Sequence, residues 1–160
     1  MLSIEAATVA DVPTILRLIR ALAEYERLSH EVVATEDSLR AALFGERPGA
    51  ECLIAREDGE PVGFALYFHN FSTFLSRRGL YLEDLFVEPA QRGKGYGKAL
   101  LQRLAHIAVE RGCGRLEWSV LDWNAPAIGL YESLGARLLI EWRIFRLTGE
   151  ALPTFASASR

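Results

Sequence analysis

The feature that most constrains the fold of this chain is a glycine-rich loop at residues 92–98, Arg-Gly-Lys-Gly-Tyr-Gly-Lys. Residues 80–87 before it are rich in leucine, aromatic and β-branched side chains and stop at a proline, which predicts a strand. Residues 98–111 after it repeat apolar side chains at helical spacing and end at a glycine, which predicts a helix. Alternate glycines leave backbone amide groups unshielded, and the start of the helix adds free donors and a positive dipole end. The loop therefore predicts a binding site for an anion, best suited to phosphate.

The loop fits neither of two common phosphate-binding templates. A P-loop needs Gly-Lys-Ser/Thr, but Lys98 is followed by Ala99, and Lys94 is followed by Gly95. A dinucleotide-binding loop needs Gly-x-Gly-x-x-Gly, and the sixth position counted from Gly93 is a lysine. The pattern that does fit is Arg-x-x-Gly-x-Gly directly after a strand. By itself this short pattern leaves an ordinary glycine-rich turn open.

The composition narrows the class of protein. The 160 residues are 50% hydrophobic and 24% charged, which is typical of one soluble globular domain. The net charge of -3 argues against a nucleic-acid partner. The two cysteines, Cys52 and Cys113, are too few for a common zinc site, and we interpret both as small buried apolar residues in a reducing compartment. With no basic-then-apolar targeting segment and no membrane-spanning run, we expect a cytoplasmic protein without a membrane or metal partner.

The hydrophobic pattern predicts six strands and four helices. The predicted strands are residues 2–6, 51–56, 61–68, 80–87, 114–121 and 137–147. The predicted helices begin after Thr8 or Asp11, after Thr35, at residue 98 and after Asn124, and they end near Tyr25, Gly45, Gly112 and Gly135. Asp58-Gly59 predicts a hairpin turn, and residues 26–34 and 69–79 predict loops. We expect a single domain at residues 1–148 and a partly disordered tail at 149–160.

This order of elements predicts an α+β fold with a mixed central β-sheet flanked by helices on both faces. The strand before the glycine loop connects to the next strand through a helix, so we expect those two strands to be parallel neighbours. Ligands of such sheets bind beyond the carboxyl ends of parallel strands. The loop therefore lies where a cofactor can reach it.

The loop pattern resembles the pyrophosphate-binding motif, Gln/Arg-x-x-Gly-x-Gly/Ala, of the GNAT superfamily of acetyl-CoA-dependent N-acetyltransferases. Three more stretches resemble the diamine (spermidine/spermine) N-acetyltransferases and their thialysine-acetylating relatives: Ala-Glu-Tyr-Glu at 23–26, Tyr-Leu-Glu-Asp at 81–84, and Trp-Asn-Ala-Pro-Ala at 123–127 with Tyr131. The similarity runs from about residue 2 to residue 148. It implies a GNAT fold, direct acetyl transfer from acetyl-CoA to a small cationic amine in a ternary complex, and a homodimer to which the last strand contributes.

The resemblance also implies the residues that hold acetyl-CoA. The backbone of Leu85, Phe86 and Val87 would pair with the pantetheine arm. The pyrophosphate would lie on Arg92, Gly93, Lys94, Gly95, Tyr96, Gly97 and Lys98. Asn124 and Ala127 would contact the lower arm of the cofactor, and Tyr131 would act there as the general acid.

Acetyl transfer needs a neutral amine, but an alkyl ammonium of pKa about 10.4 is neutral in only about one molecule in 2,500 at pH 7. Strict alternation puts Tyr81, Glu83, Leu85 and Val87 on one face of their strand, an otherwise apolar row. A carboxylate there is either a partnered structural residue or a functional one. Our hypothesis is that Glu83 removes the proton through water and attracts the cationic substrate, with Asp84 on the opposite face as second choice.

Tyr131 has two interpretations. Beside apolar neighbours on a short helix, a tyrosine is commonly a packing residue. Its hydroxyl, with a pKa near 10, can also protonate a departing thiolate whose reference pKa is about 8.5. Together with the resemblance, this favours the general acid.

The acceptor is less constrained than the cofactor. Tyr25 and Glu26 match the substrate-lining pair of the resembled family, and Glu26 with Glu83 could hold the two ends of a diamine, although a solvated Glu26 is the alternative. The residues that would line the pocket are Glu117, Trp118 and Ser119. Their identities depart from the polyamine enzymes, which leaves a thialysine-like amino acid or another small primary amine open. His30, His69 and His106 do not cluster in sequence, and we expect none of them to be a ligand.

Two other classes of function are compatible with the sequence. A protein lysine or N-terminal acetyltransferase would use the same cofactor with an open acceptor groove. A non-catalytic CoA-binding module would keep the glycine loop without turnover, and the presence of both Glu83 and Tyr131 argues against it.

Overall fold

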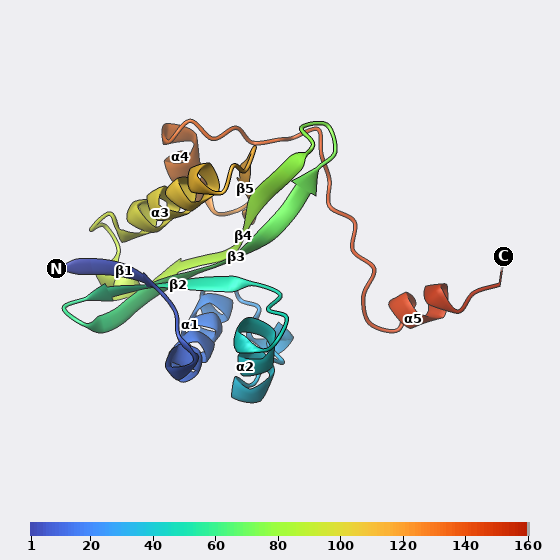
Figure 1. Ribbon diagram of the computed structural model, residues 1–160, viewed down its shortest axis with the longest axis horizontal. Helices are drawn as coiled ribbons and strands as arrows, with labels where there is room; N and C mark the ends of the chain where they lie inside the picture. Colours follow the sequence, from blue (N-terminus) through green and yellow to red (C-terminus); the bar gives the residue numbers. More distant parts are fainter. Residues whose placement is uncertain (160) are drawn as a thin grey trace. The chain divides into compact units, whose positions relative to one another are not determined.

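The computed structural model describes residues 1–159 and divides into two compact units, Met1–Ser119 and the residues from Val120 onward. The helices and strands of the first unit are β1 (Leu2–Ala6), α1 (Val12–Tyr25), α2 (Glu36–Phe44), β2 (Glu51–Glu57), β3 (Glu60–Ser72), β4 (Arg77–Val87), α3 (Tyr96–Glu110) and β5 (Leu116–Trp118) (Figure 1). Its 3-10 helices are η1 (Val9–Asp11), η2 (Ser29–Glu31) and η3 (Pro89–Gln91). The second unit contains α4 (Ala125–Ser133) and α5 (Ala151–Ala156).

The first unit is built on a five-stranded sheet of order β1-β2-β3-β4-β5. The first four strands are antiparallel, and β4 and β5 are parallel. α1 and α2 cover one face of the sheet and α3 covers the other (Figure 1). The predicted mixed sheet with helices on both faces is confirmed, as is the parallel pair joined through α3.

Two apolar layers hold the helices to the sheet. Ile15 and Leu18 of α1 are fully buried and pack with Phe64 of β3 and Phe86 of β4 in one hydrophobic cluster. On the other face, α3 buries a row of leucines at helical spacing that includes Leu100. Each such buried side chain contributes about 1.5–3 kcal/mol through removal of apolar surface from water. This core fixes β4 between α1 and α3.

Local sequence chemistry explains several element boundaries. The hydroxyl of Thr35 accepts a hydrogen bond from the Ser38 amide at 3.1 Å and caps α2, as its position predicts. The turn between β2 and β3 places Asp58 at φ 51° and Gly59 at φ 90°, the left-handed pair that a tight hairpin requires. The predicted hairpin is confirmed.

The sequence-based prediction of a loop at residues 69–79 is wrong. β3 continues to Ser72 and β4 begins at Arg77, so only residues 73–76 form the turn between them. Ser72 closes this turn by accepting a hydrogen bond from the Leu75 amide at 3.2 Å. Polar residues form strands here because the neighbouring strand supplies a hydrogen-bonding partner at each position, which the hydrophobic pattern does not record. β5 is correspondingly shorter than the predicted strand at 114–121.

In the second unit, α4 follows its prediction. The Asn124 side chain caps it by accepting a hydrogen bond from the Ala127 amide at 3.4 Å, and Gly135 follows its end at φ 91°. The predicted strand at residues 137–147 is wrong, because these residues pair with no other strand among those described. Alternating apolar side chains predict a strand only where a partner can form the ladder. The predicted tail contains α5, where the sequence predicts no helix.

Candidate functional site

The glycine loop runs from the end of β4 into α3 and has the backbone of an anion-binding turn. Gly93 and Gly95 have φ values of 82° and 83°, and no atom lies within 4 Å of the position that a Cβ would take at either residue. Gly95 is the N-cap of α3. Within residues 1–159, the amide groups of residues 93–98 donate no hydrogen bond. Consecutive unpaired amides at the positive end of a helix dipole are suited to an anion.

The side chain of Arg92 turns back onto the protein at the start of this loop. Its Nε donates to the carbonyl oxygen of Val87 at 3.0 Å. Its guanidinium carbon lies 4.4 Å from the centre of the Tyr25 ring and 5.5 Å from that of Phe86. Arg92 therefore links the glycine loop to the end of α1, where the predicted acceptor residues Tyr25 and Glu26 lie.

The middle of the loop is held by Glu57, the last residue of β2. Lys94 Nζ donates to both carboxylate oxygens of Glu57, at 3.1 and 3.0 Å, and the Tyr96 hydroxyl donates to Oε1. These hydrogen bonds lower the pKa of Glu57 from its ordinary value and raise the pKa of Tyr96 to about 12. Sequence reasoning missed Glu57, because nothing local connects it with residues 37 and 39 positions further on.

β4 loses one of its two neighbours before it reaches the glycine loop. β5 pairs with β4 only from Leu80 to Leu82, whereas β3 pairs with β4 as far as Val87. Residues 83–87 consequently have a strand partner on one edge only among the residues described. Their peptide groups on the other edge can pair with an extended ligand.

A β-bulge changes which side chains of β4 share a face. Leu66 lies opposite Asp84 while its neighbour Tyr67 lies opposite Leu82, so Glu83 is an extra residue in β4. Residues opposite each other share a face of the sheet. By that rule Asp84 lies on the face of Tyr81 and of the α1 core, and Leu85 lies on the α3 face.

The predicted row of Tyr81, Glu83, Leu85 and Val87 on one face is therefore wrong, as is the placement of Asp84 on the face opposite Tyr81. Strict alternation holds only in an uninterrupted strand. The bulge instead places two consecutive carboxylates at the point where β4 loses its second neighbour.

The charges of two carboxylates, Glu83 and Glu26, act on a third, Asp84, at this point. Burial raises the pKa of Asp84 to about 6, with smaller contributions from the negative charges of Glu83 and Glu26. Burial also raises the pKa of Glu26. Glu83 itself is exposed. Such a group of acidic side chains attracts a cation, and a carboxyl with a pKa near 6 can exchange a proton close to neutral pH.

The remaining predicted acceptor residues lie on β5 and just after it. The Ser119 hydroxyl is 2.7 Å from that of Tyr81, and Glu117 accepts a hydrogen bond from Asn70 at 3.3 Å. Trp118 pairs with Leu82 at the last position of the β4–β5 ladder. In the second unit, Tyr131 is a half-buried residue of α4. The catalytic role of Tyr131 stays a prediction.

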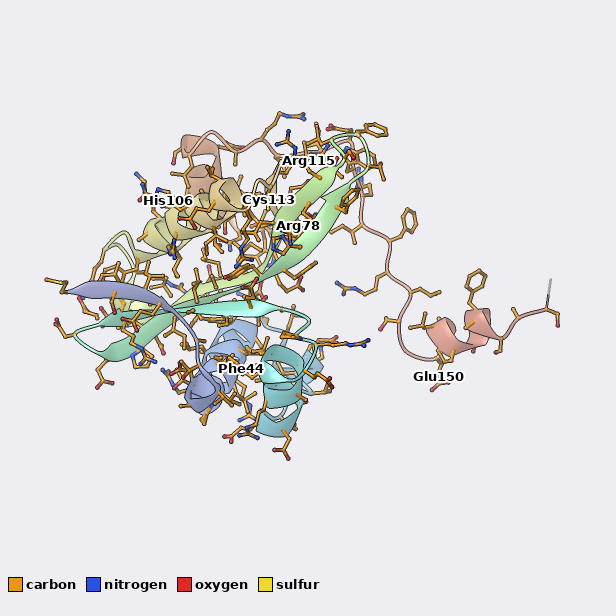
Figure 2. All side chains as sticks on the ribbon, in the orientation of Figure 1. Phe44, Arg78, His106, Cys113, Arg115 and Glu150 are labelled. Carbon is orange, nitrogen blue, oxygen red and sulfur yellow. The ribbon has the colours of Figure 1, made fainter. Side chains whose placement is uncertain are left out.

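The two cysteines lie in different surroundings. Cys52 is buried, and burial raises the pKa of its thiol to about 12, as expected for an apolar role. Cys113 is only half-buried, which corrects the prediction that both are buried. It follows α3, on the face of the sheet opposite Phe44 of α2 (Figure 2). His69 Nδ1 lies 3.8 Å from its sulfur and 3.0 Å from the Gly79 carbonyl oxygen, so His69 and Cys113 meet although they are distant in sequence.

Within residues 1–159 the helices are too short or too polar to cross a bilayer.

Comparison with known proteins gives one family. Residues 16–136 match the model of the acetyltransferase (GNAT) family. The chain is 44% identical to the thialysine N-epsilon-acetyltransferase of Bos taurus, with 96% of each chain covered. It is 36% identical to the L-ornithine N5-acetyltransferase NATA1 of Arabidopsis thaliana, covering 93% of this chain and 85% of that protein. Among solved structures, the integron cassette protein VCH_CASS6 from the V. cholerae mobile metagenome superposes with a TM-score of 0.82 at 29% identity, covering 98% of both chains. The resemblance found in the glycine loop is therefore confirmed, and the chain belongs to the GNAT family of acetyltransferases.

Proposed function

We propose that this protein transfers the acetyl group of acetyl-CoA to the primary amine of a small cationic acceptor, by direct attack in a ternary complex. The observation that carries the proposal is the arrangement along β4. A group of three carboxylates lies where the strand loses its second neighbour, and a glycine loop with unpaired amides follows the same strand. A cationic amine and an anionic cofactor can thus bind on either side of one short stretch of backbone.

The residues present fit acetyl-CoA as the co-substrate. The amides of residues 93–98 provide donors for its diphosphate, and side chains at Gly93 and Gly95 would intrude where that group approaches. The free edge of residues 83–87 provides peptide groups for the amides of the pantetheine arm. The roles of Asn124 and Ala127 in holding the lower arm follow from the family resemblance.

The carboxylates at the bulge prepare the amine for attack. The acceptor arrives as an ammonium ion, and Asp84, with its pKa near 6, takes up its proton directly or through water. Glu83 and Glu26 attract the cation. The neutral nitrogen then attacks the thioester carbonyl carbon, the C–N bond forms, the C–S bond breaks, and the thiolate of CoA leaves. The attacking nitrogen loses one further proton to water and becomes the amide nitrogen. Tyr131 donates the proton that converts this thiolate to the thiol.

The relatives favour an amino acid as acceptor. Thialysine and ornithine both carry a side-chain amine, and they are the substrates in the names of proteins to which this chain is 44% and 36% identical. The three carboxylates also suit a diamine or polyamine, whose second ammonium would need a partner. We place the thialysine-like amino acid first.

The protein as we envisage it is a cytoplasmic homodimer. Both cysteines are free, which suits a reducing compartment. Residues 137–147 expose large apolar side chains, among them Ile140, Trp142 and Ile144, each at least 74% exposed. A second copy could cover them and supply the strand partner that they lack. Light scattering of the purified protein at increasing concentration tests this, and a monomer at all concentrations would contradict it.

The decisive test is a panel of amines with acetyl-CoA, scored by release of free thiol. The panel contains thialysine, ornithine, lysine, spermidine, and peptides with a lysine side chain or a free N-terminus. We expect turnover with small cationic amines. Turnover with peptides alone would identify a protein acetyltransferase, and acetyl-CoA binding without any turnover would identify a CoA-binding module.

The general acid is tested in the same assay with Tyr131→Phe. We expect kcat to fall by about 10²- to 10⁴-fold, since this is the usual contribution of a general acid, with little change in acetyl-CoA affinity. An unchanged kcat would remove Tyr131 from the mechanism.

A further inference from the structure

Glu57 binds the glycine loop from a distant part of the chain. It is the last residue of β2 and leads into the hairpin turn at Asp58 and Gly59. Its carboxylate accepts two hydrogen bonds from Lys94 Nζ and one from the Tyr96 hydroxyl. The only other side-chain hydrogen bond of Lys94 among the residues described goes to Gln91, at 2.6 Å. One carboxylate thus holds two residues that alternate with the glycines of the loop.

The loop needs such support because of its own composition. Gly93 and Gly95 have positive φ values, and glycine loses more conformational freedom than any other residue when its backbone is fixed. The Arg92 side chain fixes the beginning of the loop through its contacts with Val87 and Tyr25. Glu57 fixes the opposite side, at Lys94 and Tyr96. With both anchors in place, the amides of residues 93–98 hold one arrangement before any ligand binds.

The charges indicate what the anchors do. The Lys94 ammonium is paired with the Glu57 carboxylate at 3.0 Å, so it is drawn towards β2. The attraction for an anion at the loop therefore comes chiefly from the unpaired amides and the helix dipole. A negatively charged residue beside an anion site opposes binding by its charge, so its benefit must come from the geometry that it imposes.

We propose that Glu57 is a positioning residue for the cofactor, which holds Lys94 and Tyr96 so that the amides of residues 93–98 are arranged for the diphosphate before acetyl-CoA binds. This inference rests on the proposed use of acetyl-CoA. Glu57 does not contact the reacting atoms, and its effect is confined to the affinity for the cofactor.

The test compares Glu57→Ala and Glu57→Gln with the control Glu60→Gln. Glu60 lies opposite Glu57 in the same hairpin and is exposed, so its substitution makes the same change of charge without touching the loop. Backbone ¹⁵N relaxation of the cofactor-free proteins gives order parameters for the amides of residues 93–98. Calorimetric titration with CoA and steady-state kinetics report affinity, KM and kcat. Tyr96→Phe removes one of the three hydrogen bonds and serves as an independent variant.

We expect Glu57→Ala to have lower order parameters at residues 93–98 and to raise the Kd for CoA and the KM for acetyl-CoA about five- to tenfold, because binding must then order the loop. kcat and the KM for the amine should stay near wild-type values. Glu57→Gln and Tyr96→Phe keep part of the network, so their Kd and KM values should lie between those of the wild type and Glu57→Ala. Glu60→Gln should match the wild type.

Two results would overturn the inference. One is unchanged order parameters at residues 93–98 together with unchanged CoA affinity in Glu57→Ala. The other is tighter binding of CoA by Glu57→Gln, which would show that the carboxylate acts only by repelling phosphate. A wild-type protein that does not bind CoA at all would instead refute the proposed function, so the two failures are distinguishable.

Discussion

Both halves of β4 lie beside β3 on one edge, but only the first half has a second strand, β5, on its other edge. The first half is residues 77–82, of which Leu80 to Leu82 pair with both β3 and β5. After the bulged residue Glu83, residues 84–87 pair with β3 alone among the residues described. Leu80 and Leu82 are at most 2% exposed, whereas Glu83 and Asp84, directly after them, carry charge at the edge of the core.

The difference shows how one strand serves structure and function. Where both edges are paired, every peptide group is satisfied and the side chains build the core. Where one edge is unpaired, the peptide groups need another partner, and a bulge re-aims the side chains beside it. Substitutions in the first half of β4 should therefore lower mainly the stability of the protein. Substitutions in the second half should lower mainly its activity.

The largest effect should come from Asp84→Asn in the second half. If Asp84 accepts the proton of the amine, kcat should fall by about 10²- to 10³-fold, within the range for general bases. Arg77→Gln, an exposed change of charge at the start of the first half, should leave kcat unchanged. Both are measured as thiol release with saturating amine. Equal rates for Asp84→Asn and the wild type would exclude Asp84 and return the role to Glu83.

The next effect should be on stability, and it should be larger in the first half. Leu80 is fully buried, so Leu80→Ala should lower the free energy of unfolding by about 2–5 kcal/mol. Leu85, in the second half, is only half-buried, and Leu85→Ala should cost about 1–2 kcal/mol. Denaturant titration monitored by circular dichroism measures both. Equal losses would show that the two halves contribute alike to the core.

A third effect is the pH dependence that Asp84 introduces. Its pKa is about 6 in the folded protein, raised from an ordinary value of 3.8, so between these values the folded state retains a proton that the unfolded state has lost. The free energy of unfolding should therefore decrease as the pH rises from about 4 to 6, by at most about 3 kcal/mol.

Asp84→Asn tests this directly. The variant lacks the titrating group, so its free energy of unfolding should exceed that of the wild type above pH 6. Near pH 4 this difference should be smaller or zero. Denaturation of both proteins at several pH values gives the difference. A difference that does not change with pH would contradict the buried position of Asp84.

The smallest effect should come from Glu26→Gln at the end of α1. Glu26 attracts the cationic acceptor in our proposal without reacting, so the KM for the amine should rise about three- to fivefold with kcat nearly unchanged. Glu24→Gln, two residues away and exposed, is the matched control. If the two variants give the same KM, Glu26 is a solvated residue without a part in acceptor binding.

Much of the fold follows from local patterns. The helices capped by Thr35 and Asn124 and the Asp58-Gly59 hairpin each depend on side chains within a few residues of one another. The glycine loop has the same property, because positive φ values and a helix start are set by neighbouring residues. For this reason the sequence also indicated the family.

The errors in the strands have the opposite origin. Residues 69–72 form a strand because β4 lies beside them, and residues 137–147 do not, because no strand partner lies beside them among the residues described. The side-chain pattern of each segment is a local property, so it does not show whether a second strand lies beside that segment.

The sequence by itself determined the capped helices, the Asp58-Gly59 hairpin, the glycine loop and the presence of Glu83 and Asp84 after a buried run. Only the tertiary structure decided that a bulge brings Asp84 to the face of Tyr81, that burial raises its pKa, and that Glu57 binds the loop from β2. The physical reason is distance along the chain. Conformation and capping depend on adjacent residues, whereas register, burial and ion pairs depend on segments that meet only after folding.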